Sequence, residues 1–169
     1  MKLLSRRAES EPEDPTVESF ESFFAREYRG VFALALALTG DRGQSEDLTQ
    51  EGFLAAFSAW ERIEDPGAWI RVAVSNKAMS WWRRQYALKR AMTRFSAADD
   101  LSSAATETEL FWDEVRLLPS RQAQAIALFY LEDRPVSEIA RLLGCSESTA
   151  RTHLSRGRET LASRLGVDE

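Results

Sequence analysis

Basic and aromatic side chains are interleaved in the middle of the sequence in a pattern that suits single-stranded nucleic acid. Between residues 66 and 94 there is no acid, and the bases are Arg71, Lys77, Arg83, Arg84, Lys89, Arg90 and Arg94. In a helix Trp82 shares one side with Arg71 and Ser75. Cations of this kind contact the phosphate backbone, and exposed rings stack on bases. The alternative is a core tryptophan pair with solubilising arginines; we expect Trp81 in the core and Trp82 exposed.

The C-terminal part of the sequence has the layout of a helix-turn-helix. An apolar stripe in the first helix (Val136, Ile139, Ala140, Leu143) precedes Gly144, which suits a tight turn. Ser146 or Ser148 can cap the next helix. Short hydroxyl donors and guanidinium groups then face outward, as a helix that reads duplex DNA requires: Ser148, Arg151, Thr152, Ser155, Arg156 and Arg158. An ordinary helical hairpin with a solvated basic face is the alternative.

A third candidate surface is acidic. Four residues lie three or four positions apart, opposite an apolar stripe formed by Phe53, Phe57 and Trp60: Asp47, Gln50, Glu51 and Leu54. Acids around an apolar side chain suit docking on a basic helical partner. A merely solvated acidic face has the same spacing, so the pattern alone leaves both interpretations open.

Helical spacing recurs along the chain and strand-like alternation is nearly absent, which predicts an all-α protein. We expect helices with a stripe from Phe20 to Leu38, from about Ser45, and from Pro66 to about Lys89, the last capped by Asp65. Further helices are expected over 110–117, 119–131, 136–143 and 148–165.

The segment between the two helical halves is rich in Ser, Ala, Thr and Asp and lacks an apolar period. From Ser96 to Glu114 the sequence has acids and no base. We therefore expect two small helical domains joined by an acidic linker. The expected divisions are a disordered N-terminal segment (1–15), a first module (16–95), a flexible linker (96–109) and a second module (110–169).

Composition excludes several classes of site. The formal charge is -5, which alone points away from nucleic acid, but the charges are segregated along the chain. One Cys and one His exclude a disulfide framework and a zinc site with more than two such ligands. No nucleophile–base pair or Gly-rich phosphate loop is present, so we expect no enzyme activity, metal or cofactor. The most apolar run, Val31 to Leu38, is too short to span a bilayer, and we expect a cytoplasmic protein without membrane insertion.

Several of these segments resemble the extracytoplasmic-function (ECF) sigma factors of bacterial RNA polymerase. Residues 38–42, 45–53, 68–76 and 82–84 are similar to conserved region two of that family, and residues 118–165 are similar to region four. The resemblance covers nearly the whole chain. The sequence departs from the family pattern at four positions: Thr49, where Val is usual, Gly52, where Ala or Val is usual, Ser80 in place of a common acid, and His153 in place of Arg or Lys.

The resemblance implies a role for each candidate surface. The acidic face (Asp47, Gln50, Glu51, Leu54) would bind the clamp helices of the core polymerase. The minus-ten strand would be held by Arg62, Arg71, Ser75, Asn76, Trp82, Arg83 and Arg84, with a flipped base in a pocket of the loop 62–67. The helix carrying Ser148, Arg151, Thr152, Ser155, Arg156 and Arg158 would read the minus-thirty-five element.

The implied partners are core RNA polymerase, promoter DNA and an anti-sigma factor. Two rival functions remain: a free-standing helix-turn-helix regulator with an N-terminal dimerisation or sensory domain, and a helical adaptor without a DNA role. The regulator would bind a symmetric duplex operator without polymerase. The adaptor leaves the bases around Trp82 and from Arg151 to Arg158 unexplained.

Overall fold

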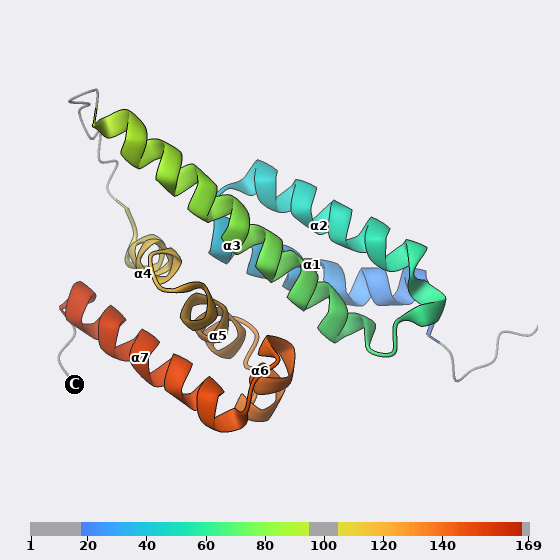
Figure 1. Ribbon diagram of the computed structural model, residues 1–169. Coiled ribbons are helices and arrows are strands. Elements are labelled where there is room, and N and C mark those ends of the chain that lie inside the picture. Colours follow the sequence, from blue (N-terminus) through green and yellow to red (C-terminus); the bar gives the residue numbers. More distant parts are fainter. Residues whose placement is uncertain (1–17, 95–104, 167–169) are drawn as a thin grey trace, which may run out of the picture.

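The computed structural model describes residues 18–94 and 105–166, and all regular structure in these residues is helical (Figure 1). The elements in chain order are α1 (Phe20–Thr39), α2 (Arg42–Ser58), a 3-10 turn (Trp60–Arg62), α3 (Pro66–Thr93), α4 (Glu107–Arg116), α5 (Ser120–Tyr130), α6 (Val136–Leu143) and α7 (Glu147–Leu165). The predicted all-α fold with two helical modules is confirmed. The first module is α1 to α3 and the second is α4 to α7. None of these helices is long and apolar enough to cross a membrane.

Side-chain caps fix most helix starts. Asp65 accepts a hydrogen bond of 2.9 Å from the Ala68 amide and stands before Pro66, as the sequence predicts. Ser146 caps α7 by accepting from the Thr149 amide at 3.1 Å. Gly144 ends α6 with φ 64°, the left-handed conformation that the predicted turn needs.

Two predicted boundaries are wrong because nearby caps were overlooked. Asp41 accepts a hydrogen bond from the Gln44 amide at 2.7 Å, so α2 begins at Arg42 and not at Ser45. Thr106 and Glu109 form a capping box, so α4 begins at Glu107 and the predicted linker ends too late. Residues 96–104 of the predicted linker and the predicted N-terminal segment (1–15) lie outside the described residues.

An aromatic cluster forms the centre of the first module. Phe23 and Phe53 are buried with their ring centroids 5.6 Å apart, and Trp60 packs 5.0 Å from Phe23. Phe57, which was expected in the same stripe, is 60% exposed. It lies in the last turn of α2, next to the exposed face of that helix.

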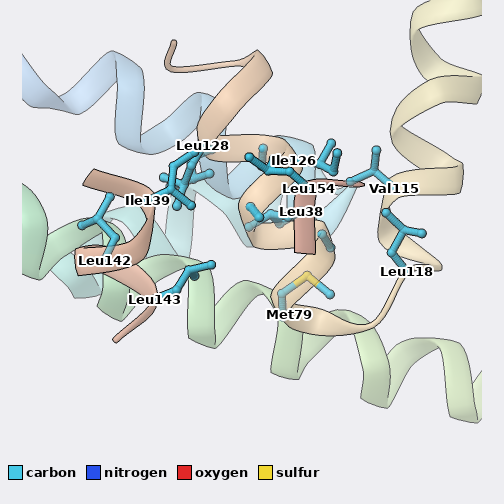
Figure 2. Packing of buried hydrophobic residues seen from close by; sticks show 14 of the residues in the cluster. Leu38, Met79, Val115, Leu118, Ile126, Leu128, Ile139, Leu142, Leu143 and Leu154 are labelled. Carbon is cyan, nitrogen blue, oxygen red and sulfur yellow. The ribbon is translucent and has the colours of Figure 1, made fainter. Parts of the chain in front are cut away.

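The two modules are not merely tethered: they pack against each other. One buried cluster contains Leu34, Leu38 and Met79 of the first module together with side chains of α4 to α7. Figure 2 shows Leu38 and Met79 among the second-module members Val115, Leu118, Ile126, Leu128, Ile139 and Leu154. The chain therefore adopts a closed arrangement, which the sequence did not predict.

Candidate polymerase and nucleic-acid interfaces

The acidic face of α2 is open to solvent. Asp47, Gln50 and Glu51 are exposed, and Leu54 is exposed by 68% beside the exposed ring of Phe57. Glu51 also forms an ion pair of 3.0 Å with Lys77 of α3, between two side chains that are themselves half exposed. Leu54 and Phe57 thus form an uncovered apolar spot with carboxylates around it, which has the composition of a protein docking site.

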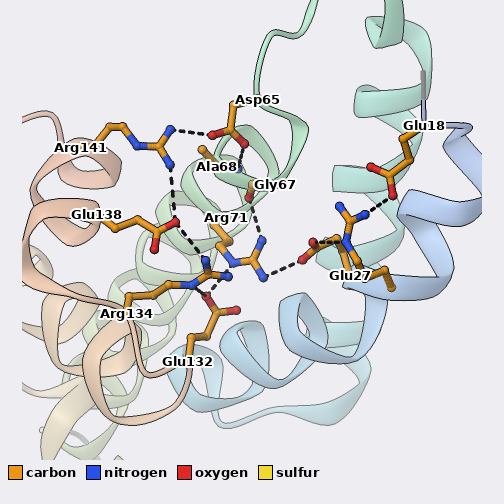
Figure 3. Close-up of polar contacts among 11 residues, drawn as sticks. Glu18, Glu27, Asp65, Gly67, Ala68, Arg71, Glu132, Arg134, Glu138 and Arg141 are labelled. Carbon is orange, nitrogen blue, oxygen red and sulfur yellow. Dashed lines mark hydrogen bonds and ion pairs between the residues drawn. The ribbon is translucent and has the colours of Figure 1, made fainter. Parts of the chain in front are cut away.

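Arg71 of α3 lies buried between two carboxylates from different modules (Figure 3). Its Nη2 donates to Glu27 Oε2 at 2.7 Å, and its Nε donates to Glu132 Oε2 at 2.6 Å. Burial acts to lower the pKa of Arg71, but the hydrogen bonds and charges of Glu132 and Glu27 outweigh it, so the pKa is raised. The expectation that Arg71 is free for a DNA strand is not met in this arrangement, because both ends of its guanidinium are occupied.

Ser75 and Asn76 are also engaged by the second module. Gln124 of α5, itself buried, donates through Nε2 to Asn76 Oδ1 at 2.7 Å and to Ser75 Oγ at 3.2 Å. Ser75 is buried, whereas Asn76 keeps an exposed edge. The expectation that Ser75 is open to a strand is therefore not met either, since α5 covers it.

The later part of α3 and the loop before it remain accessible. Arg62, Arg83 and Arg84 are exposed. Trp81 and Trp82 are both half-buried, so the expectation of one core and one exposed ring is wrong. Both rings line a groove of about 560 Å³ between α3 and α4, together with Thr39, Tyr86, Lys89 and Leu117.

A stacked pair of rings on α3 was missed in the sequence. Trp82 and Tyr86 lie with ring centroids 4.8 Å apart and planes inclined by 14°, and the Arg90 guanidinium lies 5.9 Å from the Tyr86 ring centre. The signal was available, because positions 82, 86 and 90 recur every four residues and therefore share one helix face. This row of rings and cations extends the surface suited to bases and phosphates.

The outward face of α7 carries the predicted donors. Ser148, Arg151, Thr152, Ser155 and Arg156 are exposed. Arg151 forms an i,i+4 ion pair of 3.0 Å with Glu147, and Ser155 donates to Glu159 at 3.1 Å. Such exposed contacts are weak, so these side chains can exchange them for DNA phosphates or base edges.

Arg158 differs from its neighbours on α7. Its guanidinium carbon lies 4.7 Å from the Phe129 ring centre and 5.5 Å from that of Tyr130, and its Nε donates to the Tyr130 hydroxyl at 2.9 Å. These contacts tie Arg158 to α5 and give it a packing role within the second module, but the residue is exposed, so its predicted DNA contact stays a prediction. His153 is half-buried, and its burial, with the charges of Arg121 and Arg156, lowers its pKa.

Comparisons with known proteins match both modules. The Sigma-70 region 2 family matches residues 23–88, and the Sigma-70 region 4 family matches residues 108–161. The chain is 32% identical over 149 residues to the "Probable RNA polymerase sigma factor RfaY" of Xanthomonas campestris pv. campestris, covering 80% of this chain and 37% of that protein. It is 31% identical over 147 residues to the ECF RNA polymerase sigma factor SigJ of Mycobacterium tuberculosis, covering 79% of this chain and 47% of SigJ.

The chain belongs to the ECF sigma factors. It spans less than half the length of these two curated relatives. Two solved structures of sigma factors share the fold of this ECF sigma factor: RpoE in complex with the anti-sigma factor NepR from Bartonella quintana, and CnrH in complex with the cytosolic domain of CnrY. The first has a TM-score of 0.66 at 22% identity and covers 90% of this chain and 100% of RpoE. The second has a TM-score of 0.67 at 21% identity and covers 89% of each chain.

The rival interpretations leave part of this ECF sigma factor unexplained. A free-standing regulator would need only the helix-turn-helix, whereas the region 2 match covers most of α1, all of α2 and α3 as far as residue 88. An adaptor without a DNA role would need no outward row of hydroxyl and guanidinium donors on α7. No group of three or more His, Cys, Asp or Glu in the described part of the chain could hold a metal ion.

Proposed function

We propose that this chain binds core RNA polymerase, directs it to specific promoters and helps melt the minus-ten element. The observation that carries the proposal is the match of both sigma regions, in order, to the two helical modules. The chain would act as a regulatory initiation subunit in the cytoplasm, while the polymerase carries out nucleotide chemistry.

Each surface has a part in this function. The exposed acidic face around Leu54 docks on the clamp helices of the core enzyme. Arg62, Arg83 and Arg84, with the rings of Trp82 and Tyr86, hold the unpaired strand, and Arg71, Ser75 and Asn76 join them when they are released. The outward donors of α7 read the minus-thirty-five duplex. Weak individual DNA affinities suffice, because tethering on the polymerase raises the effective concentration of each module.

We also propose an anti-sigma factor as a partner. RpoE and CnrH, which share this fold, were solved with the anti-sigma factor NepR and with the cytosolic domain of CnrY, respectively. Such an inhibitor would hold the sigma factor away from polymerase until a signal releases it.

Reconstituted transcription tests the function. Purified chain added to core RNA polymerase is expected to start transcripts at discrete positions on genomic DNA, and core enzyme alone is expected not to do so. A chain that binds duplex DNA tightly by itself and does not associate with core enzyme would contradict the proposal and support the free-standing regulator.

A further inference from the structure

Helices α5 and α7 pack closely in the second module, and one edge of their contact is basic. Gly157 of α7 lies against Ile126 of α5, where a Cβ carbon at position 157 would be 3.0 Å from Ile126 Cγ1. His153 is one turn before Gly157 and therefore lies on the same side of α7. The charge of Arg121, in the first turn of α5, acts on its ring. His153 is half-buried at this edge, and Arg121 is exposed beside it.

Three basic side chains gather at this edge without a carboxylate. Arg156, three positions after His153 on α7, is exposed, and its charge also acts on the imidazole. Within the part of the chain that the structure describes, neither Arg121 nor Arg156 forms an ion pair. An anion that approached the edge would therefore meet positive charge that no acid has already neutralised.

The acids of the surrounding helices are engaged elsewhere. Helix α5 carries no acid. Helix α4 meets α7 at its other end, where Glu114 pairs with Arg164 at 3.2 Å, about 16 Å along the helix from His153. The acids of α6 and α7 each have a partner: Glu138 with Arg134 at 3.0 Å, Glu147 with Arg151 at 3.0 Å, and Glu159 with Ser155 at 3.1 Å. The pKa of His153 is shifted by burial and by the two arginines, and by none of these acids.

The basic edge adjoins the face of α7 that the proposed function assigns to duplex DNA. Thr152 directly precedes His153 and is exposed on that face, and Arg156 belongs to both the face and the edge. Duplex DNA carries one negative charge per about 1.7 Å of its axis, so a duplex on this face brings phosphates to its border. Contacts from such a border to phosphate fix the position of the protein without reading bases.

A phosphate at this edge would change the charge state of His153. Burial chiefly, and then the charges of Arg121 and Arg156, hold the pKa of His153 below its ordinary value of 6.5 in the free chain. A phosphate oxygen beside the ring would offset the two arginines and accept a hydrogen bond from the imidazolium, and both effects raise the pKa. Binding would therefore take up a proton at any pH between the free and the bound pKa of His153.

We propose that Arg121, His153 and Arg156 form a phosphate clamp beside the outward face of α7, and that protonation of His153 tightens it. The proposal rests on the proposed function, since the phosphate belongs to the minus-thirty-five duplex, and it adds Arg121 and His153 to the DNA-binding surface. Because the bound pKa is the higher one, promoter affinity rises as the pH falls from the bound to the free pKa and is level outside that range. Promoter recognition thus strengthens on acidification.

The pH dependence of promoter binding by the reconstituted holoenzyme, from about pH 8 to about pH 5.5, tests the role of His153. His153→Arg carries a permanent charge, and His153→Gln keeps a polar side chain that cannot be charged. The affinity of the arginine variant is expected to exceed that of the glutamine variant by about tenfold throughout. Wild type should approach the glutamine variant at high pH and the arginine variant at low pH. Groups that titrate in the core enzyme act on all three chains equally, so the comparison isolates position 153.

Salt titration at low pH tests the role of Arg121. Arg121→Ala is expected to reduce the slope of log affinity against log salt by about 0.9, because one phosphate contact is lost. Arg164→Ala is the control, since Arg164 is an equally basic side chain at the far end of α7, and its slope should match wild type.

Two results would overturn the clamp. One is a wild-type pH profile parallel to those of both His153 variants, and the other is an unchanged salt slope in Arg121→Ala. Circular dichroism checks the fold of each variant, and either His153 variant alone suffices for the comparison with wild type. A wild-type chain that forms no holoenzyme defeats the proposed function instead, which keeps the two failures distinct.

Discussion

Gly52 of α2 lies so close to Val74 of α3 that a Cβ carbon at position 52 would be 2.7 Å from Val74 Cγ2. Real Cβ contacts are longer, so the two helices approach each other here at a distance that only glycine allows. The family usually has Ala or Val at this position, and in this chain the Val74 side chain fills the space. The departure from the family pattern is therefore compensated on the neighbouring helix.

Gly52→Ala is expected to lower the free energy of unfolding by about 1–3 kcal/mol, because the added methyl overpacks the α2–α3 contact. Gly43→Ala is the control: its Cβ would lie no closer than 3.6 Å to another atom, in an exposed turn of the same helix. There we expect a gain of about 0.5–1 kcal/mol from helix propensity. Urea unfolding measures both. When Val74 is also replaced by alanine, Gly52→Ala should lower the free energy of unfolding by less than it does in wild type. An equal loss with and without Val74→Ala would contradict the contact.

Thr49→Val is expected to stabilise the chain by about 1 kcal/mol, because the Thr49 hydroxyl is buried and has no hydrogen-bond partner among the described residues. Thr39→Val provides the opposite case. Thr39 is also buried, but its Oγ1 lies 2.7 Å from Ser45 Oγ and accepts from the Asp41 amide. Thermal unfolding should therefore show a higher midpoint for the first variant and a lower one for the second. A lower midpoint for Thr49→Val would reveal an unseen partner of the hydroxyl.

The ionisation of Asp65 makes the free energy of unfolding depend on pH in the acid range. The Ala68 amide hydrogen bond and the Arg141 guanidinium, opposed by partial burial, hold the pKa of Asp65 below its ordinary value of 3.8. A depressed folded pKa gives stability that is fully present above the unfolded value and lost as pH falls through the folded one. Asp65→Asn, which can still cap α3, should therefore be less stable than wild type at pH 6, and the difference should shrink below pH 3.8. Urea midpoints across this range test it, and a difference independent of pH would count against it.

Leu54→Ala is expected to weaken binding to core RNA polymerase by about tenfold or more, because a central apolar side chain of a docking site carries much of its affinity. The fold should be unaffected, since Leu54 is 68% exposed. Leu88→Ala is the matched control, an exposed leucine of α3 outside the α2 face. Fluorescence titration with core enzyme separates them. An equal loss of affinity in the two variants would contradict the assignment of the α2 face as the polymerase-docking surface.

Arg151→Ala and Arg158→Ala should fail in different ways. Loss of an exposed phosphate contact at Arg151 should lower promoter affinity of the holoenzyme and reduce the slope of log affinity against log salt by about 0.9. Loss of Arg158 should leave that slope unchanged and lower the free energy of unfolding, because Arg158 packs on Phe129 and Tyr130. Salt titrations of promoter binding and urea curves distinguish the two. A reduced slope for Arg158→Ala would contradict this expectation and support the predicted DNA contact of Arg158.

The local signals in the sequence predicted the elements well, and the contacts between modules poorly. Apolar spacing and the Asp65–Pro66 start located the helices, because these features act within a few residues. The burial of Arg71 depends on Glu132, sixty-one positions away, which no local pattern reveals. The contact of Arg158 with Tyr130 of α5 is missed for the same reason, although the predicted outward position of Arg158 on its helix is correct. The solvent exposure of side chains such as Leu54 and Arg151 agrees with expectation, because helical periodicity alone determines which side chains face outward.

The buried cluster shared by the modules has a consequence for handling the chain. A molecule that opened without a partner would present Leu38, Met79 and Leu118 to water. Contiguous apolar surface of this kind promotes self-association. Variants in which the two modules separate more readily should therefore precipitate at a lower protein concentration than wild type. Added polymerase should prevent this, because it covers the exposed faces.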